Sequence, residues 1–138
     1  MSEQTLHILL IEDDIDDVDL LKEAFVINNI DVSLEVINEG DKVAPYLANV
    51  ELTPSLIIMD LNLPKTSGRE ILKMIKTLPA FQYIPLVVFS TSSARDDINY
   101  AYSMGASKFI TKPVNIEGWN STVIIMEQVA SGPINKEQ

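Results

Sequence analysis

The sequence predicts an α/β domain in which parallel strands alternate with helices. Short apolar runs recur along the chain, and the clearest is Leu56–Met59. Runs of this kind are typical of strands buried on both faces of a parallel sheet. Segments with apolar residues at steps of three and four, as in helices, separate the runs. Polar residues follow directly on several runs, where the chain would leave the sheet.

The first strand is predicted at His7–Ile11, an apolar run that ends on acidic residues. A helix should begin near Asp14, because acidic side chains stabilise the first turn of a helix, and should end at Asn28-Asn29. Its expected buried stripe consists of Val18, Leu21 and Phe25. Val32–Ile37 alternates in part between apolar and polar residues, which predicts a half-exposed second strand near an edge of the sheet.

The third strand is Leu56–Met59, with a predicted helix on either side of it. The helix before it should cover residues 40–50 and stop at Thr53-Pro54. The helix after it should start at Ser67-Gly68 and end at Pro79. Its expected buried face consists of Ile71, Ile75 and Leu78.

The last two strands are predicted at Leu86–Phe89 and Ser107–Ile110. A helix over residues 96–104, stopped at Gly105, should separate them. Asn115 is a favourable N-cap for a final helix. That helix should bury Trp119, Val123, Met126 and Ala130 and end at Gly132-Pro133.

Five strands alternating with five helices predict a doubly wound three-layer sandwich. The flavodoxin-like strand order 2-1-3-4-5 is expected, because the first and third strands are the most uniformly apolar and should be central. We expect one domain over residues 1–131, a flexible tail over 132–138 and no output domain.

Composition excludes several classes of function. The net charge of −10 argues against nucleic-acid binding, and the lack of cysteine excludes thiolate chemistry and disulfides. No apolar run reaches the length of a membrane span, and Met1–Thr5 does not begin a secretory signal. These features predict a cytoplasmic protein without a membrane partner.

Three carboxylates are expected to meet where the first and third strands end. Glu12 and Asp13 follow the first strand and Asp60 follows the third. Their mutual repulsion would be relieved by a hard cation, and an oxygen-only ligand set favours Mg²⁺. For the other acidic residues of the first helical turn we favour simple solvation. These are Asp14, Asp16 and Asp17.

Asp60 is placed to act as a nucleophile, because a carboxylate can take up a phosphoryl group to give an acyl phosphate. Lys112 and Ser90 also follow strands and could donate hydrogen bonds to phosphate oxygens. A cis peptide bond before Pro113 would fix the Lys112 backbone. The alternatives are a turn-capping role for Asp60, a surface position for Lys112 and a turn position for Ser90.

These residues resemble the receiver domain of two-component response regulators. The matching motifs are Ile11–Asp14, Met59–Pro64, Ser90-Thr91 and Lys112-Pro113, each after a predicted strand. Each motif alone has low specificity, but the four occur in the right order from about Leu6 to Val129. The segment Ile84–Ser92 further resembles the single-domain regulators associated with bacterial phytochromes.

The resemblance implies that Asp60 accepts a phosphoryl group from a sensor histidine kinase or a phosphotransfer protein. Mg²⁺ or Mn²⁺ would be bound by Asp13 and Asp60, with help from Glu12 and the backbone carbonyl of Asn62. Ser90, Thr91 and Lys112 would contact the phosphoryl group, and Phe109 would be the switch aromatic. Pro113, Pro64 and Gly68 would be structural.

The implied protein is a signalling switch with slow autodephosphorylation and not a turnover enzyme. Its readout would be a changed surface of helix 4, strand 5 and helix 5 that binds a protein target, as a monomer or as a phosphorylation-dependent homodimer. Ser90 and Phe109 stand where threonine and tyrosine are common, so the phenolic hydroxyl is missing. A plain core or surface aromatic remains the alternative for Phe109.

Other functions fit less well. A haloacid-dehalogenase phosphatase needs its nucleophilic Asp on the first strand and a second Asp two residues later, where this chain has Asn62. A receiver-like scaffold that works without phosphorylation usually lacks one of Asp60, Asp13 and Lys112. A nucleotide-binding flavodoxin or a P-loop protein is disfavoured, because no Gly-rich phosphate loop follows the first strand. A calcium-binding loop over Asp13–Asp19 is disfavoured, because Val18 takes a position that needs a ligand and no Gly supplies the turn.

Overall fold

A single parallel sheet forms the centre of the molecule, in a computed structural model that describes residues 5–132. The strand order is β2-β1-β3-β4-β5, which confirms the predicted topology. The strands are β1 (Leu6–Ile11), β2 (Val32–Ile37), β3 (Leu56–Met59), β4 (Leu86–Ser90) and β5 (Lys108–Thr111). The helices are α1 (Ile15–Ile27), α2 (Val43–Asn49), α3 (Gly68–Thr77), α4 (Arg95–Ser103) and α5 (Ile116–Ser131), and a 3₁₀ turn, η1 (Gly40–Lys42), precedes α2.

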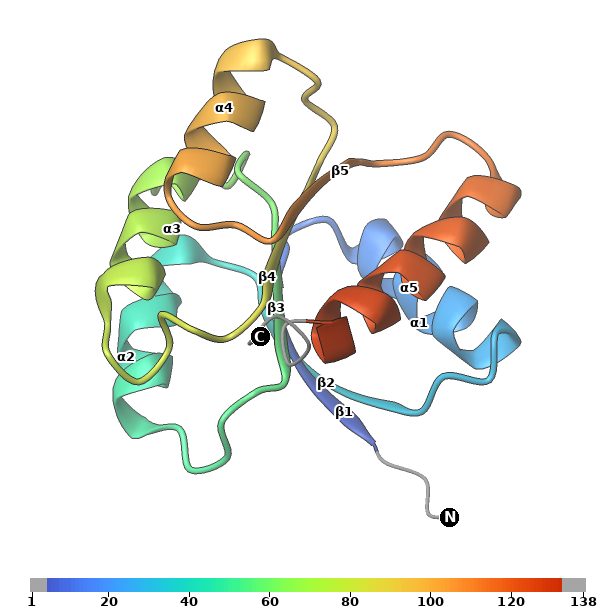
Figure 1. Ribbon diagram of the computed structural model, residues 1–138, viewed down its shortest axis with the longest axis horizontal. Coiled ribbons are helices and arrows are strands. Elements are labelled where there is room, and N and C mark those ends of the chain that lie inside the picture. Colours follow the sequence, from blue (N-terminus) through green and yellow to red (C-terminus); the bar gives the residue numbers. More distant parts are fainter. Residues whose placement is uncertain (1–4, 133–138) are drawn as a thin grey trace.

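The helices cover both faces of the sheet, as Figure 1 shows: α2, α3 and α4 lie on one side and α1 and α5 on the other. Successive residues of a strand point to opposite faces, so each central strand contributes to two cores. In β3, Ile57 and Met59 pack with α2, α3 and α4, whereas Leu56 and Ile58 pack with α1 and α5. Every residue of β3 is buried, as its apolar run predicts.

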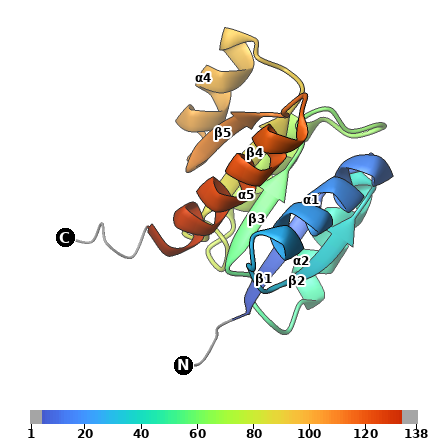
Figure 2. The same cartoon turned by 90° about the vertical axis from the view of Figure 1, so that its right-hand side faces the viewer.

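The second core holds α1 and α5 together. The two helices run side by side over the sheet in Figure 2. Trp119 packs edge-on against Phe89 of β4, with ring centroids 5.3 Å apart. The Asn28 side chain at the end of α1 donates a 3.0 Å hydrogen bond to Asn120 on α5. None of the helices within residues 5–132 is both long and apolar enough to cross a membrane.

The ends of α2 and α3 differ from the predictions. Leu78 was expected on the buried face of α3, but it has extended backbone and follows the helix. The residue before a proline is disfavoured in the helical region, so Pro79 ends α3 one residue earlier. Val50 is likewise extended and lies after α2. The predicted tail lies outside the described residues from position 133 onward.

Gly68 brings the start of α3 against the backbone that follows β3. A Cβ atom at this position would lie 2.2 Å from the Leu61 carbonyl oxygen and 2.5 Å from the Leu61 Cα atom. Backbone atoms cannot move aside as a flexible side chain can. Only glycine therefore allows this close approach, which places α3 next to the loop after Asp60.

Gly68→Ala is expected to lower the free energy of unfolding by about 2–4 kcal/mol, because the added methyl group overlaps backbone atoms. Urea denaturation of the purified variant measures this loss. Gly132→Ala is the matched control, because no atom lies within 4 Å of the added Cβ atom there. Equal stability of the two variants would contradict the close contact at Gly68.

Candidate functional site

Asp60 lies at the carboxyl edge of the sheet and is almost completely buried. Its backbone N–H donates to the Ile11 carbonyl at 3.0 Å, which continues the β1–β3 ladder past the end of β3. Its Oδ1 atom accepts a 3.0 Å hydrogen bond from the Asn62 backbone N–H. The ladder and the turn together fix the carboxylate at the position predicted from the apolar run.

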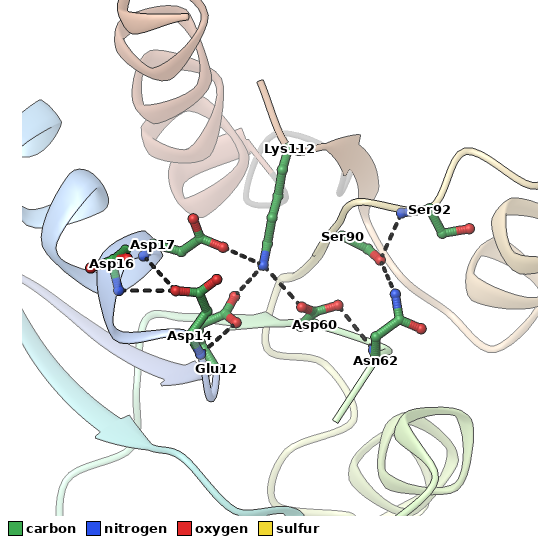
Figure 3. A network of polar contacts seen from close by, with 9 residues as sticks. All are labelled: Glu12, Asp14, Asp16, Asp17, Asp60, Asn62, Ser90, Ser92 and Lys112. Atoms are coloured by element: carbon green, nitrogen blue, oxygen red, sulfur yellow. Dashed lines mark hydrogen bonds and ion pairs between the residues drawn. The ribbon is translucent and has the colours of Figure 1, made fainter. Parts of the chain in front are cut away.

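Lys112 brings one positive charge to this carboxylate. Its Nζ atom lies 2.7 Å from Asp17 Oδ2, 2.9 Å from Glu12 Oε1 and 3.0 Å from Asp60 Oδ2. Figure 3 shows the ammonium group at the centre of these three carboxylates. The side chain is only 6% exposed, so the surface alternative for Lys112 is wrong. Burial lowers the pKa of Lys112, but its three carboxylate partners outweigh burial and hold the pKa above its ordinary value.

The Lys112 backbone is fixed by the sheet and not by a cis proline. Within residues 5–132 all peptide bonds are trans, so the cis bond that could have fixed the backbone before Pro113 is not formed. The Lys112 N–H instead donates to the Ser90 carbonyl at 2.8 Å, which extends the β4–β5 ladder by one step. A ladder bond is sufficient to orient the residue that follows a strand.

The carboxylates of Glu12, Asp13 and Asp60 can each offer an oxygen within 4.8 Å of the other two. Glu12 and Asp60 are buried, whereas Asp13 is exposed at the mouth of the site. Burial raises the pKa of Glu12 to about 7, although hydrogen bonds with Lys112 and the Asp14 amide act in the opposite direction. A hard divalent cation fits this all-oxygen set, because it would relieve both the repulsion and the burial of charge.

Asp17 belongs to the site, so the prediction that it is simply solvated is wrong. It lies in the first turn of α1 and its side chain is 16% exposed. Asp14 is the N-cap, and its side chain accepts hydrogen bonds from the backbone amides of Asp16 and Asp17. The sequence carried one signal for Asp17: it precedes the buried Leu21 by four residues, which places it on the buried face of the helix.

Ser90 is fully buried at the end of β4. Its hydroxyl oxygen accepts hydrogen bonds from the Asn62 side-chain amide at 3.3 Å and from the Ser92 backbone N–H at 3.2 Å. Asn62 therefore links Asp60 to Ser90 through its backbone and its side chain (Figure 3). Thr91, the neighbouring hydroxyl, is exposed.

Phe109 lies on β5, away from these contacts. Its ring is half-buried against the core formed with α2, α3 and α4. Its backbone N–H donates a 2.9 Å hydrogen bond to the Tyr102 hydroxyl of α4. A phenolic hydroxyl is thus present on this surface, although it comes from α4. The switching role of Phe109 stays a prediction.

An open cleft of about 540 Å³ lies beside the carboxylates. Pro64 and Gly68 line it, together with Asp13 and Asn62, so the predicted structural residues shape its wall. Pro113 is half-buried just after Lys112 and packs closely against Gly118 at the start of α5. A Cβ atom added to Gly118 would lie only 2.6 Å from the Pro113 ring. The cleft therefore opens beside Asp13 and Asn62, next to the carboxylate group.

A second polar cluster, which the sequence did not reveal, continues from Ser90 to the α3–α4 contact. The Ser92 hydroxyl donates to Asp97 at 2.7 Å, and Arg69 pairs with Asp97 at 2.8 Å. Arg69 also lies over the Tyr100 ring, 4.6 Å from its centroid. Hydrogen bonds from Arg69 and Ser92 lower the pKa of Asp97. The loop after β4 is therefore tied to both helices.

Comparison with known proteins shows which family has this fold and this arrangement of residues. A family model described as the response regulator receiver domain matches residues 8–123. The response regulator Rcp1 of Synechocystis sp. is 36% identical over 115 residues, which cover 80% of this chain and 78% of Rcp1. The probable methanogenesis regulatory protein FilR2 of Methanothrix harundinacea is 32% identical over 126 residues, covering 88% and 81% of the two chains.

Solved structures agree with these matches. The crystal structure of phosphorylated RcpA, a cyanobacterial phytochrome response regulator, superposes with a TM-score of 0.83 at 34% identity. The alignment covers 94% of this chain and 96% of RcpA. The Mn²⁺-bound form of Rcp1 gives a TM-score of 0.79 at 34% identity, covering 89% and 92% of the two chains.

Proposed function

Because the chain belongs to the response regulator receiver domain family, we propose that it accepts a phosphoryl group on Asp60 from a sensor histidine kinase or a phosphotransfer protein. The single observation that carries this proposal is the placement of the Asp60 carboxylate. It is buried, lies 3.0 Å from the Lys112 ammonium group and is grouped with two further carboxylates beside an open cleft.

The transfer is a displacement at phosphorus. An Asp60 oxygen forms a bond to phosphorus while the P–N bond of the donor phosphohistidine breaks. The electron pair of that bond stays on the imidazole nitrogen, which is protonated to give histidine. Lys112 and the Ser90 hydroxyl donate hydrogen bonds to the phosphoryl oxygens. Thr91, which follows Ser90 at the same rim, is proposed to assist.

A divalent cation completes the proposed site. Mg²⁺ or Mn²⁺ would be held by Asp13, Asp60 and Glu12, with the backbone carbonyl of Asn62 as a further ligand. The bound cation would neutralise charge that develops on the phosphoryl group. The Mn²⁺-bound form of Rcp1 supports this proposal, because that regulator is 34% identical to this chain.

The output is proposed to be a change in the surface of α4, β5 and α5. The phosphoryl group adds a dianion, and its contacts with Ser90 and Lys112 bias the protein between two states. Phe109 lies on this surface and would change its packing with the switch. The surface would then bind a protein target or a second copy of the chain. We propose that residues 1–131 form the one receiver domain that carries it.

The similarity to RcpA suggests the upstream partner. RcpA is described as a phytochrome response regulator, so we propose a phytochrome-type histidine kinase as the donor. A phosphotransfer screen against candidate kinases tests this partner. Preferred transfer from a kinase of another sensor class would contradict it.

Small-molecule phosphorylation tests the function itself. With Mg²⁺ and phosphoramidate, the purified protein is expected to gain the mass of one phosphoryl group, in a form stable to acid and labile to base. A protein that stays unlabelled at all Mg²⁺ concentrations, while a known receiver is labelled in parallel, would support the scaffold alternative that works without phosphorylation.

Asp13→Ala is expected to weaken Mg²⁺ binding about tenfold or more, because it removes one of three carboxylates grouped for the cation. Isothermal titration calorimetry at pH 8 measures the affinity. Asp16→Ala is the matched control, because Asp16 is exposed on the same segment and is absent from the group. Equal Mg²⁺ titration curves for Asp13→Ala and the parent would remove Asp13 from the metal site.

A further inference from the structure

Asp17 has no part in the proposed function described so far, yet it makes the shortest contact of Lys112. Its Oδ2 atom lies 2.7 Å from Nζ, closer than the oxygens of Glu12 and Asp60. An ammonium group has three protons to donate. Three carboxylates therefore surround the ammonium group before any phosphoryl group is present, and two of them, Asp17 and Asp60, accept its hydrogen bonds.

Asp17 differs from the other two partners of Lys112 in its position. Glu12 and Asp60 follow strands and belong to the group of carboxylates that can hold a cation, whereas Asp17 projects from the first turn of α1. The Asp14 cap holds the Asp17 backbone in place with a 3.4 Å hydrogen bond. A cation that engages Glu12 and Asp60 would leave Asp17 as the carboxylate dedicated to Lys112 (Figure 3).

A phosphoryl group on Asp60 must then compete with Asp17 for the ammonium protons. Charge-assisted hydrogen bonds of this length are among the stronger contacts in proteins. Asp17 also adds a negative charge to a site that has to accept a dianion. Both effects oppose the contact between Lys112 and the phosphoryl group.

We propose that Asp17 is a positioning residue that holds the Lys112 ammonium group on the α1 side of the site and thereby weakens its binding to the phosphoryl group of Asp60. This inference rests on the proposed function. Through Asp17, α1 would limit how strongly Lys112 can stabilise the phosphorylated state. The strength of the switch is then set partly by a residue outside the reacting group and the metal site.

Asp17→Asn is expected to tighten binding of the beryllium trifluoride anion, which mimics a phosphoryl group on a carboxylate. The amide oxygen can still accept a hydrogen bond, but the charge is gone, so Lys112 is freer to move toward the anion. We expect the affinity to rise about tenfold or more, because the loss of a negative charge and the release of Lys112 act in the same direction. Calorimetric titration at saturating Mg²⁺ measures it.

Two variants separate positioning from other effects. Asp17→Glu keeps the carboxylate and should bind the anion within about twofold of the parent. Asp16→Asn makes the same change of net charge on the same helical turn, but Asp16 is exposed and its carboxylate has no partner among the described residues. It should also stay within about twofold, because exposed charges are well screened.

The pattern across these proteins decides the inference. A gain confined to Asp17→Asn supports it, since damage to the fold would weaken anion binding. Unchanged or weaker binding by Asp17→Asn would overturn it, and so would an equal gain in Asp16→Asn. If the parent itself fails to bind the anion, the proposed function falls, and this inference with it.

Discussion

Asp60→Asn is expected to abolish the acyl phosphate completely. An amide oxygen is too weak a nucleophile to displace the donor, and no other carboxylate shares the position of Asp60 at the end of β3. Asp60 is buried, accepts a hydrogen bond from Lys112 and belongs to the cation group; Glu12 shares these properties but follows β1. Intact-protein mass after incubation with phosphoramidate and Mg²⁺ measures the loss.

The variant must be compared with one of equal charge. Asp16→Asn removes a carboxylate from the first turn of α1 without removing a contact of Lys112, and it should be labelled like the parent. An unchanged circular dichroism spectrum for Asp60→Asn would show that its fold persists. Undiminished labelling of Asp60→Asn would place the phosphoacceptor elsewhere, with Asp13 as the next candidate.

The sheet was predictable because burial on two faces leaves a plain mark on the sequence. Leu56–Met59 has no polar member, and all of it is buried at the centre of the sheet. Val32–Ile37 alternates in part, and it forms the β2 edge strand with a mixed burial pattern. Parallel topology then collects the carboxyl ends of the strands, so Asp60 and Lys112 were expected to meet.

The site was less predictable where it depends on pairs far apart in the chain. Asp17 and Lys112 are partners across 95 positions, and the acidic start of a helix is equally compatible with solvation. Arg69 and Asp97 meet only because α3 and α4 pack on the same face of the sheet. Local composition cannot show which of several charged residues finds a partner, because that choice depends on the distance between helices.

The proline beside Lys112 shows a different limit. A cis bond was a reasonable way to fix Lys112, but the strand ladder fixes the backbone first through the Ser90 carbonyl. The hydrogen bonds between strands depend on the register of each strand pair. The sequence predicts the order of the strands in the sheet but not this register. The position of Lys112 beside Asp60 was thus predicted correctly, with a wrong physical cause.

Lys112→Met is expected to lower the free energy of unfolding at pH 7 by about 3–5 kcal/mol in the absence of a divalent cation, the usual cost of removing one partner from a buried ion pair. Methionine keeps most of the length and apolar contact of the side chain. What is lost is the one ammonium group that contacts Glu12, Asp17 and Asp60. Urea denaturation measures the change, and Lys108→Met, at an exposed position of β5, is the matched control.

The pH dependence of this loss identifies its cause. Because the pKa of Lys112 is raised in the folded protein, its contribution is complete below its unfolded pKa of 10.5 and is therefore fully present at pH 7. The pKa of Glu12 is raised from 4.5 to about 7, so the folded state binds more protons than the unfolded state in this window, and ionisation of Glu12 costs stability as the pH rises. Removing Lys112 takes away a contact that lowers the pKa of Glu12, which increases this cost.

Acidification from pH 7 to pH 5, or addition of Mg²⁺ at pH 7, should therefore restore part of the stability of Lys112→Met. Both changes should leave Lys108→Met parallel to the parent. A loss that is the same at both pH values and insensitive to Mg²⁺ would mean that Lys112 stabilises the fold through packing, since packing responds to neither protons nor cations. Recovery under both conditions would show that one ammonium group and one divalent cation balance the same buried carboxylates, so that the chemistry of the site and the stability of the fold depend on a shared charge.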